Sequence, residues 1–119
     1  MKKTIKLKKN YEFNYILKKG NYFGGEVIEC FHKKNNKKEN GLGIAISSKI
    51  AGAVERNKIK RRIREAYKNL EETIETGNTF VFLWKKKVDI EECSYQKVYQ
   101  DMEKIFKKIG ILKNEQNND

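Results

Sequence analysis

Apolar residues recur at helical spacing in three segments of this chain, each with polar residues on the opposite side. The first helix, about nine residues long, is expected to follow Asn10 as its side-chain cap and to end before Gly20. A second, very basic helix is predicted from about 54 to 75. The third covers residues 95–109, where apolar positions repeat at intervals of three or four.

Three other segments carry strand patterns. Residues 22–32 alternate between two faces, and residues 42–47 place larger apolar side chains on one face and small ones on the other. Residues 79–84 form an almost unbroken apolar run, typical of a strand buried on both faces. The first two strands, separated by the polar loop 33–40, are predicted to pair as a hairpin.

The predicted element order is therefore α-β-β-α-β-α. This order indicates an α+β fold, a sandwich of helices on a small sheet of at least three strands. With 119 residues the chain has the length of one domain. We assign residues 1–9 to a basic N-terminal arm, 10–112 to the single domain and 113–119 to a frayed tail.

The distribution of charge along the chain indicates a binding surface on this fold. The net charge is +11, and the positive excess lies wholly in residues 1–68, because acidic residues outnumber basic ones afterwards. Residues 56–64, "RNKIKRRIR", hold six Lys or Arg side chains around Ile59 and Ile63. A one-sided basic surface of this kind suits a polyanion such as nucleic acid.

On a helical wheel the basic segment separates into two faces. A narrow apolar stripe is formed by Ile59, Ile63, Ala66 and Leu70, flanked by Tyr67 and Ile74. The opposite, outward face holds Asn57, Lys60, Arg61, Arg64 and Lys68, with Lys58 and Arg62 beyond its edge. The stripe predicts that the helix packs on the sheet, and the outward face predicts phosphate contacts, since arginine binds phosphate through two parallel hydrogen bonds.

Three other interpretations of the basic segment are weaker. A targeting patch would not need the interleaved Ile residues, and a membrane-surface helix would need its apolar stripe free of the strands. A purely structural charged face would alternate Glu and Lys rather than concentrate Arg. Nucleic-acid binding by domain 10–112 is the interpretation we favour.

The remaining chemistry points away from a protein catalyst. Cys30 and Cys93 lack metal-ligand spacing and are expected to be reduced thiols in a cytoplasmic protein. No signal peptide and no run of the ~20 apolar residues of a membrane-spanning helix is seen, so no membrane partner is expected. His32, the single histidine, is expected at the surface without a catalytic partner. We predict no catalytic residue and no metal site in the protein.

Residues 47–67, "SSKIAGAVERNKIKRRIREAY", closely resemble the signature of the bacterial ribonuclease P protein subunit. The positions that fit are Lys49, Gly52, Ala53, Val54, Arg56, Asn57, Lys60, Arg61, Arg64 and Glu65. The resemblance spans about residues 5–112. Lys58 stands where the family has a second Arg, and Ala51-Gly52 stand where it usually has Gly-Asn.

The resemblance implies a protein cofactor of a ribozyme that removes the 5′ leader from precursor tRNA. The RNA subunit, required for catalysis, would bind the Mg²⁺, with one protein per RNA. Contacts to that RNA would come from Lys49, Arg56, Asn57, Lys58, Lys60, Arg61 and Arg64. A cleft holding the single-stranded leader would be lined by Phe13, Leu17 and Phe31, with Lys60 and Arg64 on its rim. The resemblance also implies a left-handed β-α-β crossover, against the usual right-handed rule.

A structural RNA-binding protein, such as a ribosomal protein or an RNA chaperone, is the alternative. It would share the basic helix but would not require the leader cleft.

Overall fold

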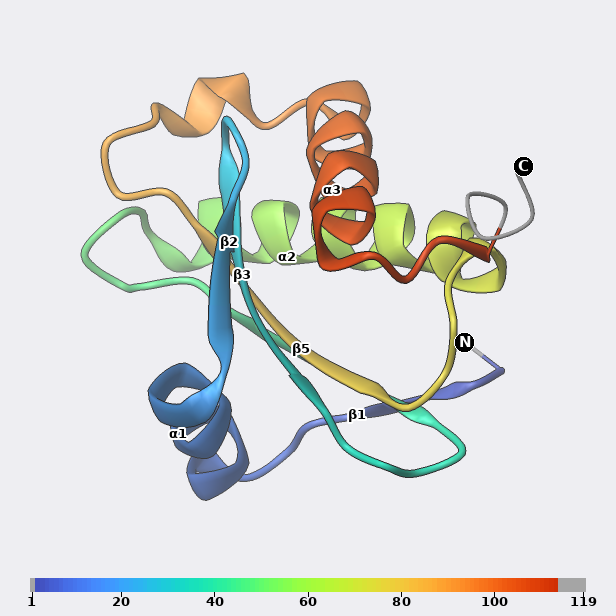
Figure 1. The fold of residues 1–119 in the computed structure, drawn as a ribbon. Helices are drawn as coiled ribbons and strands as arrows, with labels where there is room; N and C mark the ends of the chain where they lie inside the picture. The colour runs from blue at the N-terminus through green and yellow to red at the C-terminus, as the bar shows by residue number, and fades with distance from the viewer. Residues whose placement is uncertain (1, 114–119) are drawn as a thin grey trace.

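The computed structural model describes residues 2–113, which fold into three α-helices and one five-stranded sheet (Figure 1). In chain order the elements are β1 (Thr4–Lys6), α1 (Asn10–Lys19), β2 (Asn21–Gly24), β3 (Ile28–Lys34), β4 (Asn40–Ala45), α2 (Ala53–Leu70), β5 (Asn78–Trp84) and α3 (Tyr95–Ile109). Short 3-10 turns lie at Glu71–Thr73 and Ile90–Glu92. The predicted α+β fold is confirmed, with two strands more than the apolar pattern indicated.

The strands are ordered β1-β4-β5-β3-β2. β4 and β5 are parallel neighbours joined through α2, whereas β3 runs antiparallel to both β2 and β5. The predicted hairpin between strands 22–32 and 42–47 is therefore wrong, because β5 lies between them. The most apolar strand takes the central position, where both of its faces can be covered. The left-handed crossover stays a prediction.

Residues 22–32 do not form one strand. The chain turns after Gly24, so β2 and β3 pair as an antiparallel hairpin. The turn is fixed from α3, where the Asp101 carboxylate accepts backbone N–H bonds from Glu26 at 2.8 Å, Val27 at 2.7 Å and Ile28 at 3.0 Å. The anchor lies more than seventy residues away in sequence, so the local alternation could not reveal the turn.

The sheet is covered on both sides by helices (Figure 1). On one side, Phe80 and Phe82 of β5 form the centre of the core with residues of α2 and α3, among them Tyr67 and Phe106. On the other side α1 packs against β3 and β5. Because α1 is only ten residues long, it covers only part of that face, and Glu29, Phe31 and Leu83 stay half-buried there.

The N-terminal segment is not wholly an arm. Residues 4–6 form the edge strand β1, which pairs in parallel with β4. The buried Glu71 carboxylate, just after α2, holds this strand by accepting backbone N–H bonds from Lys2 and Lys3 at 3.2 Å and a hydroxyl bond from Thr4. Strand formation here depends on a partner far along the chain, which local apolar spacing does not show.

Both ends of the domain differ in detail from expectation. Lys9, not Asn10, is the N-cap residue of α1, and Asn10 makes no cap bond. The Glu12 carboxylate instead accepts the backbone N–H groups of Lys8 at 3.0 Å and Lys9 at 2.9 Å. After Gly110, Ile111 is buried and Leu112 bridges to Ile74. The predicted frayed tail, 113–119, lies outside the described residues except for Lys113.

Candidate nucleic-acid interface

Helix α2 is fixed to the sheet by the apolar stripe that its sequence predicts. Ile59, Ile63, Ala66 and Leu70 are all buried, and so are the flanking Tyr67 and Ile74. Tyr67 also exchanges a 2.6 Å hydroxyl hydrogen bond with Thr4 of β1. The buried apolar stripe therefore fixes the orientation of α2, and the basic residues on its outer side take no part in holding it to the sheet.

The outer side of α2 carries positive charge without compensation. Asn57, Lys58, Arg61 and Arg64 are exposed, and Lys60 is half-buried. In the described part of the chain the ion pairs are Lys3 with Glu72 and Lys97 with Glu92, so no cation of this face is paired. Closely spaced like charges repel, and this repulsion is relieved when phosphates bind and release counterions.

Arg56 behaves differently from the other cations. It is half-buried, and its Nη1 donates a 2.7 Å hydrogen bond to the backbone oxygen of Ala51. Its backbone N–H bonds to Gly52, the N-cap residue of α2. Arg56 thus closes the loop that leads into the helix, and part of its donor capacity is already used.

Phe13 lies at the point where α1 meets β4. A methyl group built on Gly43 would come within 2.6 Å of the Phe13 ring. The ring can therefore pack against β4 only because Gly43 has no side chain. Phe13 lines a small hollow of about 150 Å³ together with Lys60 and Arg64 of α2. The structure therefore brings three of the predicted cleft residues together from two helices.

Phe31 lies farther across the same sheet face. Gly43, Val81 and Phe31 are cross-strand neighbours in one row, so Phe31 and Phe13 share the face two strands apart. Phe31 and Leu17 are both half-buried. The roles of Phe13, Leu17 and Phe31 in RNA binding stay predictions.

The row ends in a residue that the sequence analysis missed. Tyr22 of β2 is 51% exposed and packs edge-on against Phe31, with the ring centres 5.4 Å apart. Its hydroxyl donates a 2.6 Å hydrogen bond to Glu29, and this bond raises the pKa of Tyr22 to about 12. The negative charge of Glu29 would repel RNA phosphates, but its carboxylate is held by this bond to Tyr22. The sequence analysis did not predict the β2–β3 hairpin, so it could not place Tyr22 beside Glu29 and Phe31.

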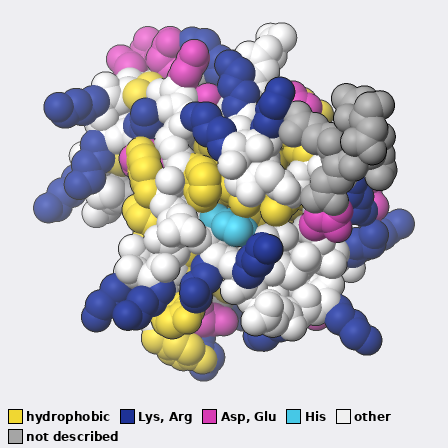
Figure 2. All heavy atoms as spheres, viewed as in Figure 1, with side chains coloured by type: hydrophobic (Ala, Val, Ile, Leu, Met, Phe, Trp, Pro, Cys, Tyr) yellow, Lys and Arg dark blue, Asp and Glu magenta, His cyan; other side chains and the backbone are white. Residues whose placement is uncertain are grey.

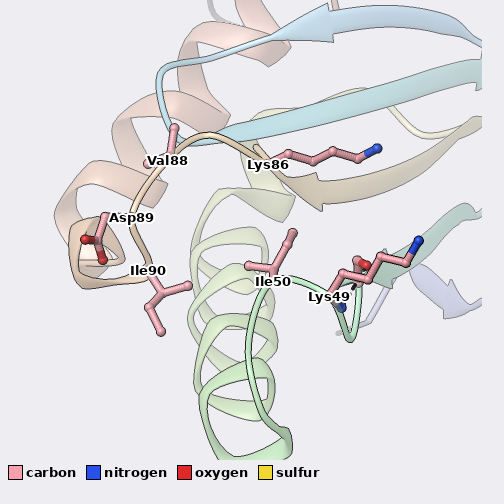
Figure 3. A pocket seen from close by; sticks show the side chains of 7 residues that line it. Lys49, Ile50, Lys86, Val88, Asp89 and Ile90 are labelled. Atoms are coloured by element: carbon pink, nitrogen blue, oxygen red, sulfur yellow. Dashed lines mark hydrogen bonds between the residues drawn. The ribbon is translucent and has the colours of Figure 1, made fainter.

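A second opening lies beside the loop before α2 (Figure 3). β4 and β5 are parallel neighbours, so the segments that follow them begin at the same sheet edge. These segments bring Lys49 and Lys86 to one cavity of about 510 Å³, with Ile50, Val88 and Ile90 on its apolar side. Lys86 was not predicted, although the run Lys85–Lys87 directly after the strand could have indicated it.

His32 is buried, which corrects the expectation of a surface residue. Its Nε2 donates a 2.7 Å hydrogen bond to Asn78 Oδ1, and burial lowers the pKa of the ring. Within residues 2–113 no group of three His, Cys, Asp or Glu side chains is placed to hold a metal ion. Across the same residues, no helix combines the length and apolar character needed to cross a bilayer.

Figure 2 shows Lys and Arg side chains spread over much of one face of the molecule, with hydrophobic side chains exposed between them. Where basic groups adjoin an aromatic ring, as Lys60 and Arg64 adjoin Phe13, phosphates can contact the cations while bases stack on the ring, which is how proteins bind single strands. The geometry thus offers a basic helix, whose outer cations form no ion pair within residues 2–113, and a partly covered sheet face that meet at Phe13, Lys60 and Arg64.

Comparison with known proteins identifies the family. The family model described as Ribonuclease P matches residues 1–110. A Bacillus cereus ribonuclease P protein component is 32% identical over 112 residues, covering 93% of this chain and 96% of that protein. One from Clostridium botulinum is 32% identical over 114 residues, covering 92% and 97%.

Solved structures agree with this assignment. The Staphylococcus aureus RNase P protein is 27% identical, covers 90% of this chain and 96% of its own, and superposes with a TM-score of 0.77. The Thermotoga maritima RNase P protein is 26% identical, covers 87% and 96%, and gives a TM-score of 0.78. The chain belongs to the ribonuclease P protein family.

Proposed function

We propose that this chain is the protein component of ribonuclease P and assists removal of the 5′ leader from precursor tRNA in the cytoplasm. The observation that carries the proposal is the outer face of α2, whose exposed cations are unpaired among the described residues and adjoin the Phe13 hollow. Membership of the family supplies the type of complex.

Contacts to the catalytic RNA come from the basic helix and the loop before it. The residues are Lys49, Arg56, Asn57, Lys58, Lys60, Arg61 and Arg64. Arg61 and Arg64 are exposed and, among the described residues, form no ion pair, so each can make two parallel hydrogen bonds to a phosphate, whereas Arg56 acts partly by holding the loop. Asn57 can read a base edge or a 2′-hydroxyl.

The leader lies on the open sheet face beside α1. Phe31 and Phe13 offer rings for stacking, Leu17 adds apolar contact, and Lys60 and Arg64 bind phosphates at the rim. Stacking does not depend on base identity, so this cleft suits leaders of varied sequence.

The protein acts as a cofactor and not as the catalyst. Hydrolysis belongs to Mg²⁺ ions held mainly by the RNA subunit, with one protein per RNA. Protein cations reduce the repulsion between RNA phosphates, which lowers the Mg²⁺ concentration at which the RNA and its substrate assemble.

Reconstitution tests this proposal. Adding the protein to ribonuclease P RNA should restore cleavage of precursor tRNA at low Mg²⁺ and should tighten binding of precursor over leaderless tRNA. A general RNA-binding protein or chaperone would bind both RNAs without the leader-dependent gain. Absence of both effects would refute the proposal.

A further inference from the structure

A second groove lies on the far side of α1 from the cleft. One wall is the exposed side of α1, and the other is the end of β3 with the loop that follows it. Its volume is about 770 Å³, larger than the hollow at Phe13. Neither the basic helix motif nor the predicted cleft includes its residues.

The α1 wall presents two tyrosines. Tyr11 is 69% exposed and Tyr15 is 52% exposed, and their spacing of four places both rings on one side of the helix. Within the described part of the chain neither makes a hydrogen bond or a ring contact. Figure 2 shows hydrophobic side chains at the surface over α1, with Lys and Arg beside them. The two rings therefore give this wall of the groove an apolar surface that a ligand can contact.

The opposite wall is basic. Lys33, Lys34 and Lys37 line it, and none of them lies within ion-pair distance of a carboxylate among the described residues. The pKa of Glu12 is lowered mainly by the backbone N–H groups of Lys9 and Lys8, which its carboxylate accepts, and to a smaller extent by the charge of Lys37. The groove therefore carries net positive charge.

The loop after β3, which carries Lys37, is held in shape. The Asn35 side-chain amide donates to Thr79 at 3.0 Å and to the backbone oxygen of Glu39 at 3.1 Å, and its oxygen accepts the N–H of Lys37 at 2.7 Å. Asn36 adopts the left-handed conformation with φ of 58°. A preformed wall loses little conformational entropy when a ligand binds.

Leu7 connects the groove to the cleft. It lines both the groove and the Phe13 hollow, and its N–H bonds to the backbone oxygen of Leu42 at 2.9 Å. A single-stranded RNA that leaves the cleft past Leu7 therefore enters the groove at the start of α1.

We propose that this groove binds single-stranded RNA, namely the leader nucleotides upstream of those in the cleft. Bases stack on Tyr11 and Tyr15, and phosphates contact Lys33, Lys34 and Lys37. The inference rests on the proposed function and extends it, because it assigns a second section of the same leader to a separate surface.

The test uses the reconstituted complex and precursor tRNAs whose leaders lengthen one nucleotide at a time. With wild-type protein, affinity should rise again once the leader extends beyond the cleft. The variant Tyr11→Ala/Tyr15→Ala should lose about tenfold or more on long leaders, since stacking is worth about 1–3 kcal/mol per base, and should match wild type on short ones. Tyr11→Phe/Tyr15→Phe keeps the rings and should behave as wild type.

The outcomes separate the two proposals. An equal loss on short and long leaders, or no loss, would overturn the groove while leaving the proposed function intact. A complex that fails to cleave with wild-type protein would instead refute the proposed function. The groove is then tested with the isolated protein and an unstructured RNA oligonucleotide, to which Tyr11→Ala/Tyr15→Ala should bind at least tenfold more weakly than Tyr11→Phe/Tyr15→Phe; equal binding would overturn it.

Discussion

The buried ring of His32 should make the stability of the fold depend on pH. Burial lowers its pKa below the usual 6.5, while the hydrogen bond to Asn78 partly opposes the shift. The unfolded chain then binds the proton more readily than the folded one, so the free energy of unfolding should decrease as pH falls below about 6.5. Urea unfolding between about pH 7.5 and 5.5 measures this decrease. His32→Gln, which does not titrate, should show a smaller decrease, and an equal one would exclude the ring as its source.

Gly43 sets how closely α1 can approach the sheet. Gly43→Ala places a methyl group 2.6 Å from the Phe13 ring and 3.0 Å from Leu7, so both must move. We expect a loss of about 1–3 kcal/mol in stability and weaker leader binding. Gly52→Ala is the comparison, because nothing lies within 4 Å of its new methyl group, so its cost is limited to the weaker helix capping by Ala, below about 1 kcal/mol, and it should leave leader binding on the sheet face unchanged. Similar losses for both variants would contradict the packing argument.

Among elements, α2 was predictable and the β2–β3 hairpin was not. The stripe of Ile59 and Ile63 and the cations opposite it repeat within one segment, so helical periodicity alone assigns both faces. The hairpin depends on Gly24 as an end and on Asp101 as an anchor, and strand order depends on β5 entering between β3 and β4. Such pairings join distant segments, and local alternation carries no information on them. Tyr22 was missed for the same reason.

The outer face of α2 yields a prediction about salt. Arg61→Ala should weaken binding to ribonuclease P RNA and reduce the slope of log affinity against log salt by about one, since one phosphate contact is lost. Lys104→Ala removes the same charge from an exposed position of α3 and should leave the slope unchanged. Binding titrations at several salt concentrations decide between them, and equal slopes for both variants would place the RNA elsewhere.

Helix α3 supports the open sheet face through Asp101. Asp101→Ala leaves three backbone N–H groups without their acceptor, so the β2–β3 turn should loosen and stability should fall by roughly 3 kcal/mol. Glu103→Ala changes an exposed carboxylate on the same helix and should have little effect. Denaturant unfolding measures both, and a small effect of Asp101→Ala would mean that the turn holds its shape without α3.

At the scale of the whole molecule, the surfaces that we propose to bind RNA lie around β4 and the segments beside it. β1 covers only Asn40–Leu42, so the second half of β4 stays open between α1 and α2. The Phe13 hollow lies there, the Lys49 and Lys86 opening lies beyond the ends of β4 and β5, and the groove lies past Leu7. These surfaces are contributed by α1, α2 and the segments before and after the central strands, and α3 contributes to none of them.

The edge strand β1 depends on Glu71, whose hydrogen bonds join the start of the chain to the end of α2. Burial opposes its ionisation, but the hydrogen bonds from Thr4, Lys3 and Lys2 outweigh burial and lower the pKa of the carboxyl. Its contribution to stability is therefore complete above about pH 4.5 and is lost as pH falls through the folded-state pKa.

Glu71→Ala should release β1 without unfolding the core, because the strand is short and lies at the sheet edge. Hydrogen exchange should accelerate at the N–H groups of Leu7 and Asn40, which bond across the β1–β4 pair at 2.9 Å and 2.8 Å. Glu72→Ala removes only an exposed ion pair with Lys3 and should leave both rates unchanged. Equal exchange in the two variants would show that backbone pairing alone holds β1. Faster exchange only in Glu71→Ala would identify this buried carboxylate as the group that keeps Leu7, and with it the passage from cleft to groove, in place.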